Sequence, residues 1–267
     1  MLLAAALPLD TLLVALAAGV VASFACGLGA LPLLVPRIDP ARHTGIGYGI
    51  AGGLMFAASV YNLILPGIQL GGGEHSLTRL LAVVGGILAG CGFIALIERH
   101  LPHEAAADDD EKFRAWGGRV GLLVFIAMSA HSIPEGVAVG VGYASDTLVD
   151  GGSRLGPTLA LAIAIHNIPE GLAVSIPMRT RGASIARCFW AAVLTSVPQP
   201  LATVPAIVLA WLFNPLMPVM MGFAAGAMIF LVVLELIPQA LALASPTKIA
   251  WSFAIGFCAM IMIQVVL

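Results

Sequence analysis

Charged residues are scarce in this chain of 267 residues: they make up 10% of it, against 60% hydrophobic residues. Soluble globular proteins contain about 25% charged residues, so the composition excludes that class. The formal net charge is −2, which leaves no basic surface for a nucleic acid. The cysteines are few, lie far apart and form no C-x-x-C pair, so they predict no disulfide framework: Cys26, Cys91, Cys188 and Cys258. These absences point to an integral membrane protein.

Long hydrophobic runs occupy most of the chain. A transmembrane helix needs about 20 predominantly apolar residues, and eight stretches qualify: 9–35, 44–69, 77–97, 118–143, 157–178, 185–212, 216–240 and 248–267. The loops between them are short except for 98–117, which leaves no room for a soluble domain. The sequence therefore predicts an all-α integral membrane protein with eight transmembrane helices, folded as a single transmembrane domain over residues 1–267.

Basic residues are distributed unequally between the two sides of this bundle. The side that holds the loops after the first, third, fifth and seventh stretches carries Arg37, Arg42, Arg99, Lys112, Arg114, Arg119, Arg179, Arg181, Arg187 and Lys248. The opposite side carries only Arg79 and Arg154. Basic loops remain in the cytoplasm, so both termini are predicted to lie outside. The first stretch lacks a preceding basic segment, which favours a span over a cleaved signal.

The cytoplasmic loop 98–117 is predicted to be flexible and is rich in histidine and acidic residues: Glu98, His100, His103, Glu104, Asp108, Asp109, Asp110 and Glu111. Runs of charge are usually solvated linkers. Histidine and carboxylate side chains are also competent metal ligands. A linker and a weak metal-collecting loop are both compatible with this composition.

One sequence motif occurs twice within apolar stretches. Residues 131–139 read His-Ser-Ile-Pro-Glu-Gly-Val-Ala-Val, and residues 166–174 read His-Asn-Ile-Pro-Glu-Gly-Leu-Ala-Val. Each copy places a His and a Glu four residues apart, on one face of a helix. The two stretches are consecutive and hence antiparallel, so the copies can meet near the midplane of the membrane. Pro134 and Pro169 predict a kink in each helix, which is tolerated where it lines a protein-enclosed cavity.

The paired phrase favours a site for a divalent metal. An isolated carboxylate in hydrocarbon costs several kcal/mol, whereas one dication balances both Glu135 and Glu170. His131 and His166 add nitrogen ligands. Nitrogen with carboxylate suits zinc and its first-row neighbours, while magnesium and calcium prefer oxygen alone. The structural alternative is a pair of kinked helices with buried polar groups.

At these residues the chain resembles the ZIP family of metal transporters, the Zrt/Irt-like proteins, in their bacterial form. That resemblance implies eight helices, both termini outside, a metal path between the fourth and fifth helices, and transport by sliding one helix group against another. Residues 52–66 resemble the second helix of the family and place Met55 as a thioether ligand. Residues 234–238, Leu-Glu-Leu-Ile-Pro, resemble its E-x-x-P motif and give Glu235 a role in metal exit.

The chain departs from the family at the positions of a second, adjacent metal. Ser132 and Asn167 follow the two histidines, and Gln199 stands where a glutamate is expected on the sixth helix. All three are neutral, so two dications would face only two carboxylates. We therefore expect one strong site, formed by Met55, His131, Glu135, His166 and Glu170. A second site is expected to be weak or absent, with Ser132, Asn167, Gln199 and Glu235 as its residues or as the path.

The resemblance implies passive or proton-influenced movement of divalent cations across the inner membrane into the cytoplasm, with zinc first and cadmium, iron or manganese as further candidates. The metal is then substrate, and no prosthetic group is expected. An intramembrane metallohydrolase is the alternative from the enzyme class, but it needs a metal-bound water and a general base, and the H-E-x-x-H phrase is absent. A non-metal transporter or channel would not require His131. The sequence leaves monomer and homodimer open.

Overall fold

The computed structural model describes residues 9–35, 40–69, 76–100, 118–148, 154–180 and 182–266, and within these ranges it is helical without any strand. The α-helices are α1 (Leu9–Leu28), α2 (Pro40–Ala58), α3 (Leu65–Gln69), α4 (Leu77–His100), α5 (Gly118–Leu148), α6 (Leu155–Thr180), α7 (Ile185–Thr195), α8 (Pro198–Leu212), α9 (Met217–Leu231), α10 (Ile237–Leu243) and α11 (Pro246–Val266). Two short 3₁₀ turns, η1 (Leu31–Leu34) and η4 (Asn214–Leu216), and two π-helical segments, η2 (Ser59–Ile64) and η5 (Val232–Leu236), complete them.

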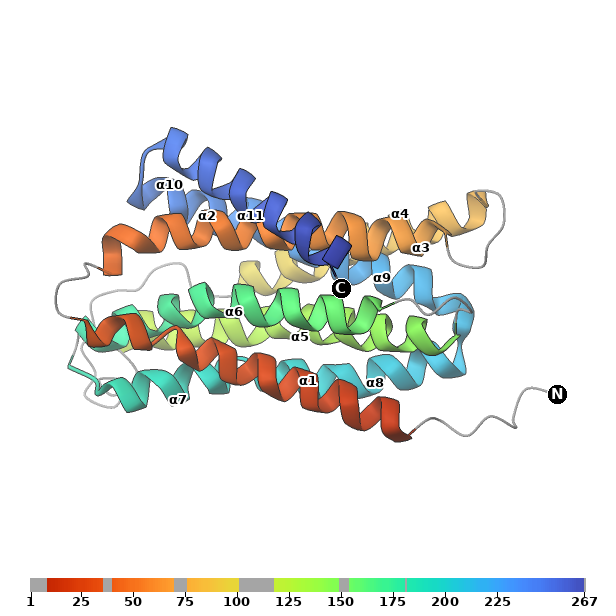
Figure 1. Ribbon diagram of the computed structural model, residues 1–267, viewed down its shortest axis with the longest axis horizontal. Helices are drawn as coiled ribbons and strands as arrows, with labels where there is room; N and C mark the ends of the chain where they lie inside the picture. Colours follow the sequence, from red (N-terminus) through yellow and green to blue (C-terminus); the bar gives the residue numbers. More distant parts are fainter. Residues whose placement is uncertain are drawn as a thin grey trace.

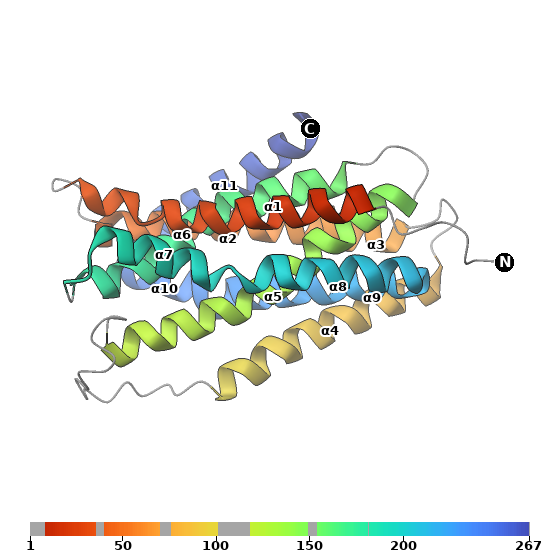
Figure 2. The same cartoon turned by 90° about the horizontal axis from the view of Figure 1, so that it is seen from below.

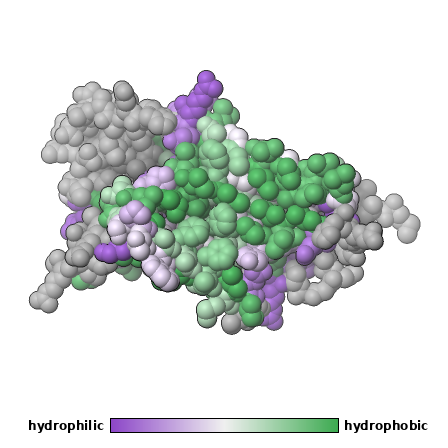
Figure 3. All heavy atoms as spheres, turned by 90° about the horizontal axis from the view of Figure 1, so that it is seen from above, coloured by the Kyte–Doolittle hydropathy of each residue, from purple (hydrophilic) through white to green (hydrophobic). Residues whose placement is uncertain are grey.

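Seven helical segments are long and apolar enough to cross a membrane: Leu9–Leu34, Thr44–Gln69, Leu77–His100, Leu155–Ile176, Ile185–Leu212, Asn214–Leu243 and Pro246–Val265. They coincide with seven of the eight predicted stretches. The remaining stretch forms α5, a helix of 31 residues that contains the first motif. Most of the described surface in Figure 3 is hydrophobic, as contact with lipid requires.

Three predicted spans are interrupted rather than continuous. The sixth breaks between α7 and α8, where Pro198 begins the second half. The second and seventh contain the π-helical segments η2 and η5. Of the predicted 98–117 loop, residues 98–100 extend α4, and residues 101–117 lie outside the described residues.

The helices pack as two groups (Figures 1 and 2). In the first, here called the motif group, α5 packs along α8 and α1 packs along α6, with α7 beside both α1 and α6. In the second, here called the frame group, α4 packs along α9 and α2 packs along α11 and α10. The groups meet where α5 contacts α9 and where α2 contacts α6. The two motif helices therefore form the inner wall of one group and face the frame.

Glycines join the helices within each group. A Cβ on Gly53 of α2 would collide with the Phe253 carbonyl of α11, and one on Gly226 of α9 would collide with the Ile87 carbonyl of α4. In the motif group, a Cβ on Gly171 would collide with the Cys26 carbonyl. Such close backbone approach is the usual way in which small residues join membrane helices. Glycines spaced four apart, such as Gly222 and Gly226, therefore mark packing faces of these helices.

The contacts between the two groups are looser. Among the described glycines, every one whose added Cβ would collide with the backbone of another helix does so within its own group. Across the boundary, a Cβ on Gly47 of α2 would lie 3.7 Å from the Pro169 side chain of α6, an ordinary van der Waals contact. The motif helices are thus fixed to α1 and α8 more tightly than to the frame.

One acidic side chain fixes the motif helices to each other. Asp146, near the end of α5, accepts hydrogen bonds from the backbone N–H groups of Leu155 and Gly156, both at 2.9 Å. These N–H groups open α6 and have no partner within that helix. Because the helices are antiparallel, this contact helps to hold the two motif copies at matching depth.

The glycine contacts predict a large effect of a single methyl group. Gly226→Ala forces a Cβ against the Ile87 carbonyl and should lower stability by about 1–3 kcal/mol, as overpacking does. Gly92→Ala, on α4 with open space around its Cβ, is the matched control and should leave stability unchanged or slightly higher. Thermal unfolding of the purified variants in detergent measures the difference. Equal midpoints for the two variants would show that this helix contact tolerates a side chain.

Candidate metal centre

The second motif lies against the first at the centre of the motif group. Glu135 comes from α5, and His166 and Glu170 come from α6. One ligand atom from each of these three lies within 4.8 Å of the others, and all three side chains are buried. The shortest contact joins His166 Nε2 to Glu135 Oε1 at 3.2 Å. Two carboxylates and an imidazole thus converge, as the spacing of the motifs predicts for antiparallel neighbours.

His131 is directed toward a different acid. Its Nε2 lies 3.4 Å from Oε1 of Glu235, in an ion-pair contact without the alignment of a hydrogen bond. Glu235 belongs to η5 in the frame group, so this contact joins the two groups. Glu235 also has a side-chain hydrogen bond with Glu98, which lies in the last turns of α4. The sequence placed Glu98 in the flexible loop, whereas the structure places it on a helix beside the proposed exit residue.

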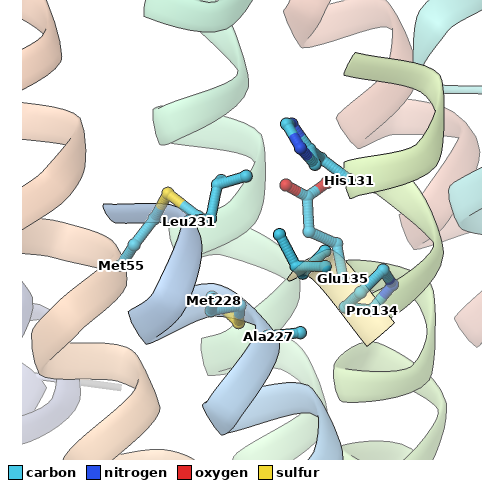
Figure 4. Close-up of a pocket in the computed structure, with 8 residues that line it drawn as sticks. Met55, His131, Pro134, Glu135, Ala227, Met228 and Leu231 are labelled. Atoms are coloured by element: carbon cyan, nitrogen blue, oxygen red, sulfur yellow. The ribbon is translucent and has the colours of Figure 1, made fainter. Parts of the chain in front are cut away.

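A small cavity is lined by His131 and Glu135 on the motif helices and by Met55 on α2. In Figure 4, His131 and Glu135 lie on one side of it and Met55 of α2 on the other, with Leu231 of α9 between them in this view. Met55 is fully buried. The predicted thioether ligand therefore lies on the frame group, while the four predicted ligands of the two motifs lie on the motif group.

Several ligand atoms in this region have no protein partner. Among the described residues, Oε2 of Glu135, Oε1 of Glu170 and both ring nitrogens of His131 are buried without a hydrogen bond. The great majority of buried polar atoms in proteins have a hydrogen-bond partner, and a buried carboxylate needs a compensating charge. A cation bound between these groups would supply both.

The predicted residues of the second site use part of their hydrogen-bonding capacity on protein atoms, while Oδ1 of Asn167 and Nε2 of Gln199 are buried without a partner among the described residues. The Ser132 hydroxyl donates to the carbonyls of Met128 and Thr195, at 3.1 and 3.0 Å. The Asn167 amide donates to the Ala22 carbonyl at 3.1 Å and to Oε1 of Gln199 at 3.2 Å. These bonds join α5 to α7, and α6 to both α1 and α8. Side chains with these partners hold the motif group together and present no negative charge to a second ion.

Two features of the site were missed by sequence reasoning: the contact of His131 with Glu235, and the π-helical geometry that surrounds Glu235. The proline of the Leu-Glu-Leu-Ile-Pro phrase is the one signal that could have suggested the second. A proline removes an N–H donor from the helix, and in the structure Pro238 lies two residues beyond the end of η5.

Fold and site together define a class of protein: an all-helical membrane protein whose motif helices bring together buried imidazole and carboxylate groups that could hold a metal ion, of the kinds that suit transition-metal cations. Comparison with known families agrees, because residues 98–264 match the family model described as ZIP Zinc transporter. The chain belongs to the ZIP family. It is therefore a transporter of divalent metal cations and not an enzyme, and the hydrolase alternative finds no support.

Individual relatives give the same result. The chain is 33% identical over 226 residues to the zinc transporter GufA of Myxococcus xanthus, covering 84% of this chain and 87% of that protein. It is 34% identical over 220 residues to the zinc transporter ZIPB of Bordetella bronchiseptica, covering 80% and 69%. It is also 39% identical over 236 residues to a putative zinc transporter of Arabidopsis thaliana, At3g08650, covering 88% of this chain but only 36% of that longer protein.

The converging ligands predict a specific loss of metal binding. His166→Ala should weaken zinc binding by at least about 100-fold, because even outer-shell substitutions at metal sites cost 10–100-fold. His100→Ala is the matched control: this histidine lies at the exposed end of α4, where its ring bonds the carbonyl of Leu96. Calorimetric titration of the detergent-solubilised variants measures both affinities. A similar loss in both would mean that the motif is not the main site.

Proposed function

We propose that the chain carries Zn²⁺ across the inner membrane into the cytoplasm through one binding site between the motif helices. The observation that carries the proposal is the convergence of Glu135, His166 and Glu170 within 4.8 Å, in a family whose relatives are named as zinc transporters. The nitrogen and carboxylate ligands favour zinc and its first-row neighbours over magnesium and calcium. Cadmium, iron and manganese are further substrates for the same ligand set.

The proposed ligand set is Met55, His131, Glu135, His166 and Glu170. Met55 joins it because its side chain lines the same cavity as His131 and Glu135. Its place on the frame group means that the thioether reaches the ion only while the two groups are suitably aligned. The second site stays weak in this proposal, since Ser132, Asn167 and Gln199 are neutral and the first two donate to protein oxygens.

In the membrane, the chain is proposed to cross eight times, with α5 as the fourth span and both termini outside. The bias of basic residues toward one side supports this orientation. The opposite directions of successive long helices in Figure 1 are compatible with it. The helices α5 and α6 are proposed to bend at Pro134 and Pro169, where a proline removes one backbone hydrogen bond from each.

Transport is proposed to proceed by sliding of the motif group against the frame group. Close glycine contacts lie within the groups, and the contact at Gly47 across the boundary is an ordinary one, so the boundary is the natural place for movement. The ion would leave the site past Glu235, which already lies 3.4 Å from His131, and past Glu98 beside it. Two acids at the end of the path attract a departing dication toward the cytoplasm.

Uptake of radiolabelled zinc into proteoliposomes tests this proposal. Wild-type protein should give saturable uptake. Glu170→Ala and His131→Ala should each lower the initial rate at least about tenfold, because each removes a ligand worth more than about 1.4 kcal/mol. Ser129→Ala, on α5 with its hydroxyl bonded only to its own helix at Phe125, is the control. Equal flux in all variants would refute transport through the motif site.

A gain of charge tests the single-site stoichiometry. Gln199→Glu places a carboxylate within reach of Asn167, where two dications would then face three acids instead of two. We expect the number of zinc or cadmium ions bound per chain to rise from one to two, as counted by titration or by anomalous scattering from crystals. Two ions already bound to the unsubstituted protein would contradict the proposal.

A further inference from the structure

The frame group contains an internal repeat between α2 and α9. The spacing of two glycines and a methionine in α2 recurs unchanged in α9: Gly49, Gly53 and Met55 correspond to Gly222, Gly226 and Met228. In the same register, Leu63 and Ile64 correspond to Leu236 and Ile237. The two π-helical segments also begin at matching positions, Ser59 and Val232.

The glycines and the π-helical segments of the two copies make corresponding contacts. Gly53 packs against the backbone of α11 and Gly226 against that of α4, in each case at a carbonyl oxygen. The π-helical segment of each copy packs against the helix of the other, η2 on α9 and η5 on α2. The two copies run in opposite directions through the bundle (Figures 1 and 2). This is the arrangement of inverted repeats related by a two-fold axis in the membrane plane.

The register of the repeat makes Asn62 the counterpart of Glu235. Each residue is the fourth of its π-helical segment. Single π-helical turns inside α-helices occur frequently at functional sites. Glu235 lies against His131, the first residue of the first motif. The corresponding residue of the second motif is His166, so the repeat relates the pair Glu235–His131 to the pair Asn62–His166.

The surroundings of Asn62 suggest that its carboxamide has a role in ligand binding. The side chain is fully buried, and neither its oxygen nor its nitrogen has a hydrogen-bond partner among the described residues. Leaving one such group unpaired costs about 1–3 kcal/mol, whereas a leucine of nearly the same shape would cost nothing of the kind. The unpaired carboxamide of Asn62 is therefore open to a ligand that enters this part of the bundle.

We propose that Asn62 is a cation-contacting residue on the uptake side, where its carboxamide oxygen receives the partly hydrated divalent cation before the ion reaches His166. The proposal rests on the proposed transport function and adds to it the residue that mirrors Glu235. In inverted repeats, the two copies exchange their roles when access to the midplane site alternates between the two sides. The neutral amide of Asn62 would hold the cation weakly where it enters. The carboxylate of Glu235 would hold it more strongly on the side of release.

A transport experiment tests the role of Asn62. Asn62→Leu should lower the initial rate of zinc uptake into proteoliposomes about tenfold, while the affinity of the solubilised protein for zinc at the motif, measured by calorimetry, changes less than about twofold. Asn62→Asp should lower the zinc concentration that gives half-maximal uptake. Ser59→Ala is the control, because this hydroxyl of the same segment donates to the Met55 carbonyl. Its uptake should match that of the wild type.

A second experiment detects the cation at this position without transport. Asn62→Cys, in a chain whose four native cysteines are replaced, should give the ultraviolet charge-transfer band of a cadmium–thiolate bond when Cd²⁺ is added. Ser59→Cys, at a position of the same segment whose native hydroxyl bonds the Met55 carbonyl of its own helix, should not. Loss of that band in Asn62→Cys when His166 is also replaced would show that the two residues share the ion.

The outcomes separate this inference from the proposed function. Saturable wild-type uptake together with unchanged uptake by Asn62→Leu would overturn the role of Asn62 and leave the transport function standing. Absence of the cadmium band would do the same. Lower thermal stability of Asn62→Leu with normal uptake per folded molecule would also overturn it, by showing a structural role. Absence of saturable wild-type uptake would refute the transport function itself.

Discussion

Two carboxylates enclosed by apolar helices set the main constraint on this molecule. Glu135 and Glu170 repel each other, and water cannot screen them in a packed interior. A divalent cation bound between them would remove the repulsion and replace the lost hydration. The surroundings of the site are compatible with that proposal: histidines lie beside the carboxylates, and glycines let α1 and α8 support α5 and α6 at backbone distance.

The same constraint explains why the bundle consists of two unlike groups. The groups are joined internally by backbone contacts at glycine, which have almost no freedom to slide. Between the groups, side chains meet at ordinary distances, and the closest polar contact described there is His131 with Glu235. In the proposed function, His131 contacts either the bound ion or Glu235 of the frame group. The side chain would thereby link occupation of the metal site to the boundary along which the two groups would move.

Much of this could be predicted from the sequence, because its strongest signals are local. Hydrophobic length predicted the seven helical segments that are long and apolar enough to cross a membrane, and the repeated His and Glu predicted the approach of Glu135, His166 and Glu170. The breaks were missed, since a π-helical turn depends on tertiary packing and leaves the run of apolar residues unchanged. The partner of His131 was missed because Glu235 is distant in the chain. The likeness of α2 to α9 was visible in the glycine and methionine spacing, but only the matching π-helical segments reveal Asn62 as the equivalent of Glu235.

The position of Met55 has a thermodynamic consequence for the transport cycle. In the proposed movement the other four proposed ligands would travel with α5 and α6, so an ion that moved with them would leave the thioether behind, and its affinity would differ between the two ends of the movement. In a carrier that moves only its cation, this difference cannot concentrate the metal, because free energies around a closed cycle sum to zero. Replacing Met55 would therefore change how fast zinc equilibrates across the membrane, while the final ratio of concentrations on the two sides stays the same.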